Sequence, residues 1–358
     1  MKNLLSLNLE QLEDLVTGLG ERPYRTEQLL RWVHRRAEQD IDRMTDIKTS
    51  FRDQLKGSMT IRGPRLLRES TCADGTIKWL LDATLGNAIE CVYIPDGGRA
   101  TLCISSQVGC ALECAFCATG KQGFNRNLEF GEIVGQLWFA RRRVRELELQ
   151  PITNVVLMGM GEPLLNYDAV LSTLRVVVHQ HAYCVPRRRV TLSTSGIAPE
   201  IRRLAKDCPV ALAVSLHAPT DALRDRLVPI NRKYPIQQLM QACSEYLDIS
   251  GQTHVTFEYV MLDGINDSDS HARELIALAR TIRCKVNLIP FNPFREAGFR
   301  RSSDETIYRF NGLLNCSGVV TTTRRTRGSD EAAACGQLAG RVLDRTRRAA
   351  RATARLGA

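Results

Sequence analysis

Apolar and polar positions follow two alternating patterns along most of this 358-residue chain. Six short, nearly continuous apolar runs predict strands that are buried on both faces: TLCISS, NVVLMG, RVTLST, VALAVSLH, THVTFEYVML and KVNLIPF. Each run is followed by a stretch with apolar residues every three or four positions, such as DAVLSTLRVVVHQ, which predicts a helix. Strands that alternate with helices indicate a parallel sheet. We therefore predict an α/β fold with a partial barrel of six βα units over residues 96–330, with catalytic groups at the carboxyl ends of the strands.

The segments that flank this core have different patterns. Residues 1–60 contain three amphipathic stretches, which predict a helical accessory domain with Thr45 or Asp46 as the N-cap of its last helix. Residues 61–95 hold two strand-like runs, TIKWLLDA and NAIECVYIP, separated by a turn signal, and these predict a linking β-hairpin. Residues 331–358 combine a loop of small residues with an arginine-rich end. We therefore expect four parts along the chain.

Charge and hydropathy narrow the class of protein. The 49 lysines and arginines outnumber the 39 aspartates and glutamates, which leaves a formal net charge of +10. This excess favours a polyanion such as RNA as a partner, and a basic surface without a special role stays the alternative. No apolar stretch approaches the roughly 18 residues that a membrane span requires, and acidic residues interrupt the N-terminus before the apolar segment of a signal peptide develops. The sequence predicts a cytoplasmic protein that is not a membrane protein.

Three cysteines stand close together in CALECAFC, directly after the first predicted strand. Cys110, Cys114 and Cys117 are therefore expected on the first βα loop, at the catalytic end of the barrel. A structural zinc site needs four ligands, whereas a [4Fe–4S] cluster held by three thiolates keeps one iron open for a small molecule. Zinc bound by these residues and Cys103, in a non-catalytic RNA-binding protein, stays an alternative. Most of the other cysteines are expected to be buried apolar residues.

The C-x3-C-x2-C spacing resembles the signature of radical S-adenosylmethionine (SAM) enzymes, in which the cofactor chelates the open iron. MGMGEP resembles the glycine–glutamate motif of that superfamily, in which Glu162 would accept a hydrogen bond from the cofactor's ammonium group; an ordinary loop turn is the alternative. The segments LSTSG, SLHAP and PFNPF each end a predicted strand, where polar groups meet the rest of the cofactor. The resemblance thus implies this cofactor-binding set: Gly161, Glu162, Ser193, Ser215, Leu216, His217 and Asn292.

The chain resembles one family within that superfamily more closely, from about residue 5 to residue 340. SSQVGCALECAFCATGKQGFNRNL, GMGEPLLN, RRTRGSDEAAACGQLAG and GERPYRTEQLLRW resemble the RNA adenine methyltransferases of the RlmN/Cfr type, particularly the C2-methylating branch. REAGFR at 295–300 departs from the proline- and glycine-rich loop that is usual in the family.

The resemblance implies a cytoplasmic, monomeric enzyme with a [4Fe–4S] cluster and two molecules of SAM per turnover, one as methyl donor and one as radical source. Its implied targets are an adenosine in the peptidyl-transferase region of 23S rRNA (adenosine 2503) and the adenosine 3′ to the anticodon in some tRNAs (adenosine 37). Methylation of C8 of the same rRNA base is the alternative within the class. A reducing partner such as flavodoxin is also implied.

Three catalytic residues are implied by the same resemblance. Cys335 lies at the position of the cysteine that carries the methyl group. Cys103 lies at the position of a second thiol, which forms a disulfide with the carrier. Glu90 lies at the position of the base that accepts the C2 proton. Strand alternation puts Cys103 on the polar face of TLCISS and Glu90 among apolar neighbours. A partly buried carboxylate has a raised pKa, which suits a general base. A buried small residue at Cys335 and an edge-strand glutamate at Glu90 stay the alternatives.

Arginines in three regions are candidates for contact with RNA, and a solvated charged surface is the alternative for each. These candidates are Arg22, Arg25, Arg31, Arg35 and Arg36 in the helical domain, Arg141–Arg143, and Arg324, Arg325 and Arg327, together with the arginine-rich end.

Overall fold

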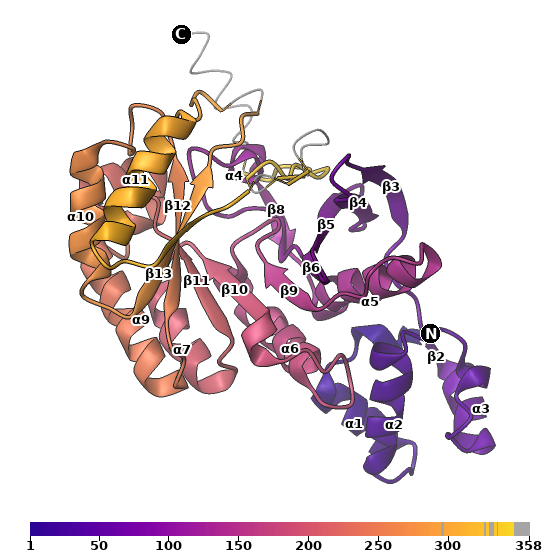
Figure 1. The fold of residues 1–358 in the computed structure, drawn as a ribbon. Coiled ribbons are helices and arrows are strands. Elements are labelled where there is room, and N and C mark those ends of the chain that lie inside the picture. Colours follow the sequence, from indigo (N-terminus) through magenta and orange to yellow (C-terminus); the bar gives the residue numbers. More distant parts are fainter. Residues whose placement is uncertain (295–296, 326, 329–332, 335, 347–358) are drawn as a thin grey trace.

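A computed structural model describes residues 1–294, 297–325, 327–328, 333–334 and 336–346. Cys335 and most of the arginine-rich end lie outside these described residues, so the roles suggested for them remain predictions. The described chain forms a curved sheet with helices along its outer side and a separate group of helices at the N-terminus (Figure 1).

A ten-stranded mixed sheet forms the centre of the molecule. In pairing order its strands are β14 (Thr321–Thr323), β13 (Cys284–Pro290), β12 (Val255–Met261), β11 (Ala211–Ser215), β10 (Val190–Thr194), β9 (Asn154–Leu157), β6 (Arg99–Cys103), β5 (Ala88–Asp96), β4 (Ile77–Asp82) and β3 (Leu66–Thr71). The seven strands from β6 to β14 in this order are parallel, and β3 to β6 are antiparallel. The six predicted core strands all form, and β14 extends the sheet by one short strand that the sequence did not predict.

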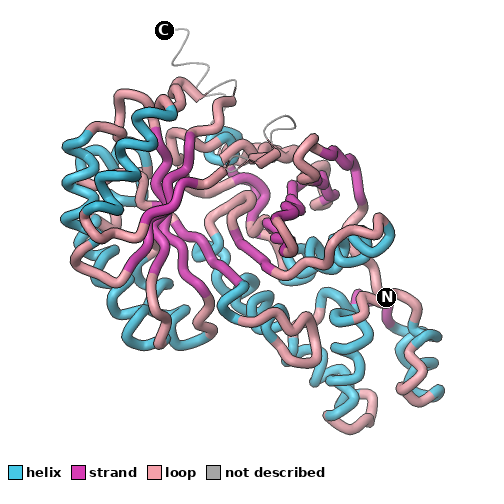
Figure 2. Tube along the Cα trace, in the orientation of Figure 1, coloured by secondary structure: helices cyan, strands magenta, loops and turns pink. Residues whose placement is uncertain are grey.

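Helices connect the parallel strands and cover the outer face of the sheet, as the secondary-structure view in Figure 2 shows. They are α5 (Phe130–Glu146), α6 (Tyr167–Val178), α7 (Ala198–Asp207), α8 (Asp221–Leu227), α9 (Ile236–Ser250), α10 (Asp269–Ala279) and α11 (Asp304–Cys316). The prediction of βα units is confirmed, with α8 as an additional short helix. The pairing order ends at β14 on one side and at β3 on the other, so within the described residues the sheet stays open and the barrel is partial.

The two strands predicted for residues 61–95 are β4 and β5, which pair antiparallel with Leu80 opposite Glu90. They do not form an isolated hairpin, because β3 pairs with β4 on one side and β6 pairs with β5 on the other. This segment therefore continues the core sheet, and residues on β5 and β6 share one face.

The N-terminal helices are α1 (Leu9–Gly18), α2 (Tyr24–Leu30) and α3 (Thr49–Ser58), and the short strands β1 (Lys2–Asn3) and β2 (Met59–Thr60) pair in parallel. The helix α1 begins only after Asn8, because Asn8 and Gln11 form a reciprocal capping box. The predicted N-cap of α3 at Thr45 or Asp46 is wrong, since α3 begins at Thr49. Asp46 instead accepts hydrogen bonds from Trp32 and Gln28, which tie the domain together.

The arginines of α5 join the N-terminal domain to the core. The guanidinium of Arg142 donates to the carbonyl of Ala37 at 3.0 Å, and Arg141 donates to the carbonyl of Arg35 at 3.3 Å. Arg143 forms a bidentate ion pair with Glu69 on β3. These contacts give the three arginines a role within the protein, and their contact with RNA stays a prediction.

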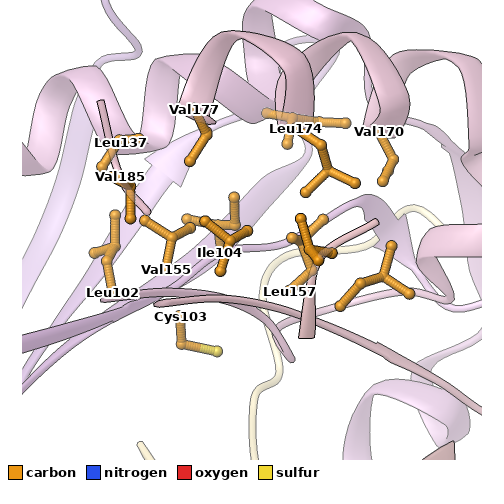
Figure 3. Close-up of a cluster of buried hydrophobic side chains, with 14 of the residues drawn as sticks. Leu102, Cys103, Ile104, Leu137, Val155, Leu157, Val170, Leu174, Val177 and Val185 are labelled. Atoms are coloured by element: carbon orange, nitrogen blue, oxygen red, sulfur yellow. The ribbon is translucent and has the colours of Figure 1, made fainter. Parts of the chain in front are cut away.

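The face of the sheet under α5 and α6 is filled by aliphatic side chains (Figure 3). Leu102 and Ile104 point into this core with Val155 and Leu157, whereas the side chain of Cys103 points to the opposite face. The alternation predicted for TLCISS is thus present, and it directs the thiol of Cys103 to the face of the sheet opposite Leu102 and Ile104.

Candidate active site

The three clustered cysteines lie on a closed loop above the carboxyl end of β6. The loop runs from β7 (Gln107–Gly109) through α4 (Ala118–Gln122) to β8 (Phe124–Asn127), and β7 and β8 pair antiparallel at its base. The backbones meet so closely there that a Cβ on Gly109 would lie 2.1 Å from the carbonyl oxygen of Gly123, and Gly109 has a φ of +76°. The glycines therefore permit the close pairing that holds the cysteine loop against the sheet.

A pocket with about 1020 Å³ of empty space opens at the carboxyl ends of the parallel strands. Of the residues predicted from the sequence, those that line it are Cys110, Cys114, Cys117, Gly161, Glu162, Ser193, Ser215, His217 and Asn292. Leu216 does not line it: this side chain is fully buried in the hydrophobic core on the other face of the sheet, so the prediction of cofactor contact by Leu216 is not supported.

Glu162 is held rigidly at the wall of the first pocket. Its side chain is 2% exposed, and its two oxygens accept from the backbone N–H groups of Leu164 at 3.1 Å and Ser195 at 2.7 Å. Burial raises the pKa of Glu162, and the hydrogen bonds from Ser195, Thr194 and Leu164 oppose that rise. The preceding Gly161 has a φ of +100°, and a Cβ there would lie 2.6 Å from the Cβ of Gln107. The glycine–glutamate motif thus places a fixed acceptor in the pocket.

His217 presents one defined edge to the same pocket. The backbone N–H of Val260 donates to Nδ1 of His217 at 3.0 Å, which leaves Nε2 as the protonated nitrogen of a neutral ring. Burial, with a smaller contribution from Arg224, lowers the pKa of His217 to about 3. The ring of Phe116, from the cysteine loop, packs edge-on against it with centroids 4.6 Å apart. His217 is therefore a neutral hydrogen-bond donor in the pocket.

The cysteine loop fits an iron–sulfur cluster in its donor set. All three thiols face the pocket that also holds Glu162, and burial raises the pKa of each thiol, that of Cys114 to about 12. Among the described residues, no three His, Cys, Asp or Glu side chains are close enough to hold a single metal ion. In a cluster the thiolates bind separate iron atoms, so they stand farther apart than the ligands of one ion. Cys103 is not part of this wall, so the geometry gives no support to a four-cysteine zinc site.

A second pocket, with about 1280 Å³ of empty space, adjoins the first. Cys103, which is 7% exposed, lines it with Val92 and Ile94 from β5. Three arginines, Arg324, Arg325 and Arg327, line the same space. The two pockets share part of their walls, namely Met158, Ile289, Asn292, Arg324 and Leu338. A ligand in the second pocket would therefore lie next to a ligand in the first.

Glu90 lies on β5, on the same face as Val92 and Cys103. It is 6% exposed, and its carboxylate is 3.2 Å from the ammonium of Lys78 on β4. Its other oxygen accepts from the backbone N–H of Ala339 at 2.9 Å. Glu90 is not among the residues that line either pocket, because the segment around Ala339 covers it.

The chain on either side of Cys335 reaches both pockets. Ala333 and Ala334 line the second pocket, and Gly336 lines the first. The segment after Gly336 then pairs with the cysteine loop, where Ala118 donates its N–H to Gly336 at 2.8 Å and Thr119 donates its hydroxyl to Leu338 at 2.6 Å. This C-terminal segment therefore connects the cysteine loop with the strand that carries Glu90.

Some pocket residues were missed at the level of sequence. Glu258 is 5% exposed and lines the first pocket, where burial raises its pKa and Asn287 donates to it at 2.9 Å. Glu258 lies inside an apolar run, so the only sign of its role in the sequence was a charged residue within a strand that was predicted to be buried. Gln107 accepts from the N–H groups of both Ala111 and Glu162, and thereby joins the cysteine loop to the glycine–glutamate motif.

Comparison with known proteins agrees with this site. A family model described as the ribosomal RNA large subunit methyltransferase N-terminal domain matches residues 2–61, and the model of the radical SAM superfamily matches residues 104–276. The crystal structure of a radical SAM methyltransferase from Sphaerobacter thermophilus is 45% identical, with a TM-score of 0.87 over 94% of this chain and 99% of that chain.

Two further solved structures match this chain at much lower identity. Streptococcus suis SuiB bound to S-adenosylmethionine is 14% identical, with a TM-score of 0.47 over 62% of this chain and 49% of that chain. The FeFe-hydrogenase maturase HydG from Carboxydothermus hydrogenoformans is 16% identical, with a TM-score of 0.46 over 63% of this chain and 53% of that chain. These two add nothing to the assignment.

The fold and the cysteine-lined pocket define a radical SAM enzyme. More particularly, the chain belongs to the RlmN-type radical SAM methyltransferases. Membership of the superfamily implies a [4Fe–4S] cluster and SAM as cofactors. No helix in the described part of the chain is both long and apolar enough to cross a membrane.

Proposed function

We propose that this protein methylates C2 of an adenosine in large-subunit ribosomal RNA, and C2 of the adenosine 3′ to the anticodon in some tRNAs. The observation that carries the proposal is the pair of adjoining pockets. One pocket is lined by three thiols and a fixed carboxylate, and the other by a buried thiol and three arginines. The match to an rRNA methyltransferase N-terminal domain supports rRNA as substrate.

In the first pocket, Cys110, Cys114 and Cys117 hold the cluster, and Glu162 accepts from the ammonium group of SAM. Ser193, Ser215, His217 and Asn292 contact the rest of that molecule, with Nε2 of His217 as a donor. When bound, the cofactors supply a methyl group from one SAM molecule and, after one-electron reduction, an organic radical from a second.

In the second pocket, the target adenine lies against Cys103, with Arg324, Arg325 and Arg327 near its phosphates. Adenine C2 is electron-poor, so a methyl group carried on the sulfur of Cys335 is transferred through a carbon radical that bonds to C2. Glu90 accepts the C2 proton, and one electron of the adduct would return to the oxidised cluster that supplied the electron at the start. The thiolate of Cys103 then attacks the sulfur of Cys335: an S–S bond forms, the S–C bond breaks, and the released carbon takes a proton. An external reductant restores the two thiols.

The ammonium of Lys78, 3.2 Å from the carboxylate of Glu90, holds that side chain in place. The N-terminal domain, with exposed Arg22, Arg35 and Arg36, extends the surface offered to RNA. An acidic one-electron donor such as flavodoxin remains part of the proposal, as does a monomeric cytoplasmic enzyme.

The position of methylation is tested with unmodified RNA transcripts. The reconstituted enzyme is incubated anaerobically with SAM, a reductant and 23S rRNA fragments or tRNA, and the digested nucleosides are separated chromatographically before mass spectrometry. We expect 2-methyladenosine from both RNAs. A product that co-elutes with 8-methyladenosine would overturn the C2 assignment in favour of the alternative.

The two thiols are tested by substitution in the same assay. We expect Cys335→Ala never to acquire a protein-bound methyl group, and Cys103→Ala to accumulate a covalent protein–RNA adduct, both visible in intact-protein mass spectra. Cys316→Ala, an exposed thiol at the end of α11, is the matched control and keeps wild-type turnover. Wild-type turnover by both Cys335→Ala and Cys103→Ala would refute the two-thiol scheme.

A further inference from the structure

Arg224 on α8 is a fully buried arginine, with 0% of its surface exposed. Its guanidinium lies between the ends of the two strands that supply Ser193 and Ser215 to the first pocket. It donates to the carbonyl of Ser195 after β10 at 2.7 Å, to that of Ser215 at the end of β11 at 3.1 Å, and to that of Leu216 just after β11 at 3.1 Å. One side chain therefore fastens two strand ends that form the wall of the cofactor pocket.

No carboxylate among the described residues forms an ion pair with this guanidinium. Its remaining partner is the amide oxygen of Asn231 at 2.8 Å, and the amide nitrogen of Asn231 in turn donates to Asp221 and Asp225. All direct contacts of Arg224 are thus to neutral oxygens. A buried charge without a direct counter-ion is costly, because its desolvation is not repaid by attraction to an opposite charge.

The cysteine loop lies against the same helix. The backbone N–H of Ala115, next to Cys114, donates to the carbonyl of Leu227 at the end of α8. Leu227 follows Arg224 by one turn of α8, and Ser195, whose carbonyl accepts from Arg224, lines the first pocket together with Cys114. Asp221 and Asp225 lie one amide away, beyond Asn231, and the three thiols of the cysteine loop face the pocket whose wall Arg224 fastens.

We propose that Arg224 is the buried countercharge of the cluster bound by Cys110, Cys114 and Cys117, and that it raises the cluster's reduction potential. This inference rests on the proposed cluster site. Reduction adds one negative charge to a centre whose ligands are already anionic. A fixed positive charge in a low-dielectric surrounding stabilises that reduced state more than the oxidised one. Arg224 therefore makes the electron transfer that starts each turnover easier, while its hydrogen bonds hold the strand ends in place.

The test is a redox titration of the reconstituted protein, followed by the electron paramagnetic resonance signal of the reduced cluster. We expect Arg224→Met, which removes the charge but keeps an unbranched stem, to lower the equilibrium constant for reduction at least tenfold, a shift of about 59 mV to more negative potential. Arg224→Lys keeps the charge, so its midpoint stays near that of the wild type. With fewer donors, the lysine variant binds SAM more weakly.

The matched control is Arg226→Met, which removes an exposed charge from the same helix and leaves the potential unchanged. Iron and sulfide analysis accompanies each titration, and Arg224→Gln replaces the methionine variant if that variant takes up less than a full cluster. A fully loaded neutral variant with the wild-type midpoint would overturn the inference, as would equal shifts in the lysine and methionine variants. The titration needs no RNA, so its outcome is separate from the question of C2 methylation.

Discussion

At the scale of single residues, the first pocket depends on residues whose conformation is fixed by the backbone around them. Gly161 combines a left-handed φ with van der Waals contact to Gln107, and Glu162 uses both carboxylate oxygens to hold backbone N–H groups. Such an acceptor needs no reorganisation to bind a cation, because its orientation is set before the ligand arrives.

Glu162→Gln removes this fixed negative charge with little change of shape. We expect SAM to bind at least tenfold more weakly, because a neutral amide attracts the cofactor's ammonium less and its NH2 group opposes one of the backbone N–H donors. The measurement is equilibrium binding of SAM to cluster-loaded protein, with iron content determined in parallel. Glu258→Gln is the control, since an amide oxygen there still accepts from Asn287, and we expect a change of less than about threefold. Equal losses in the two variants would contradict a specific role for Glu162.

The sequence predicted most of these residues because the carboxyl ends of parallel strands meet at one edge. Leu216 is the exception among the predicted cofactor-binding residues, because it does not line the pocket. The strand β11 ends at Ser215, and His217 has a φ of +60° in the turn that follows. Ser215 and His217 line the pocket, whereas Leu216 is buried in the core. The role of Gln107 as a bridge could not be predicted, because it depends on two loops that are 55 residues apart.

At the scale of elements, the C-terminal segment connects parts that are far apart in the sequence. Ala88 on β5 and Arg341 exchange backbone hydrogen bonds, and Gln122 at the end of α4 donates to the carbonyl of Gly340. The segment thus lies between the cysteine loop and Glu90. Sequence patterns predicted β5 and the cysteine loop separately. They gave no sign of this third element, because its backbone pairs irregularly and its side chains are small.

Gly340→Ala tests this connection. A Cβ at Gly340 would lie 2.2 Å from the carbonyl oxygen of Ala88, so the segment must move away from β5. We expect methylation of Cys335 to fall at least tenfold, measured as the mass increase of the intact protein, while the iron content stays at the wild-type level. Gly312→Ala on α11, where a Cβ meets nothing within 4 Å, is the control. Unchanged methylation in Gly340→Ala would show that the position of this segment does not matter for the carrier.

At the scale of the whole molecule, the N-terminal domain and the core form one continuous hydrophobic cluster, and a buried histidine lies at their contact. His34 has no exposed surface, and its Nδ1 is 3.3 Å from the hydroxyl of Tyr183, which follows α6. Burial lowers the pKa of His34 to about 3, with smaller contributions from His179 and Arg141. The domain contact was not predictable from local pattern, because it joins residues 149 positions apart.

The lowered pKa of His34 makes stability depend on pH in a defined direction. Between about pH 6.5 and pH 3 the unfolded chain binds a proton at this site and the folded chain does not, so stability is full above pH 6.5 and falls as the solution is acidified. At pH 5 the loss is about 2 kcal/mol for His34. His217, with the same lowered pKa, adds a similar loss. We expect the free energy of unfolding of His34→Gln to decline less steeply between pH 7.5 and pH 5 than that of the wild type. The difference in slope corresponds to about one proton fewer taken up on unfolding. Denaturant titrations followed by circular dichroism measure this free energy at each pH. The same slope in variant and wild type would mean that His34 is protonated in the folded protein, and hence that the contact between the domain and the core admits water.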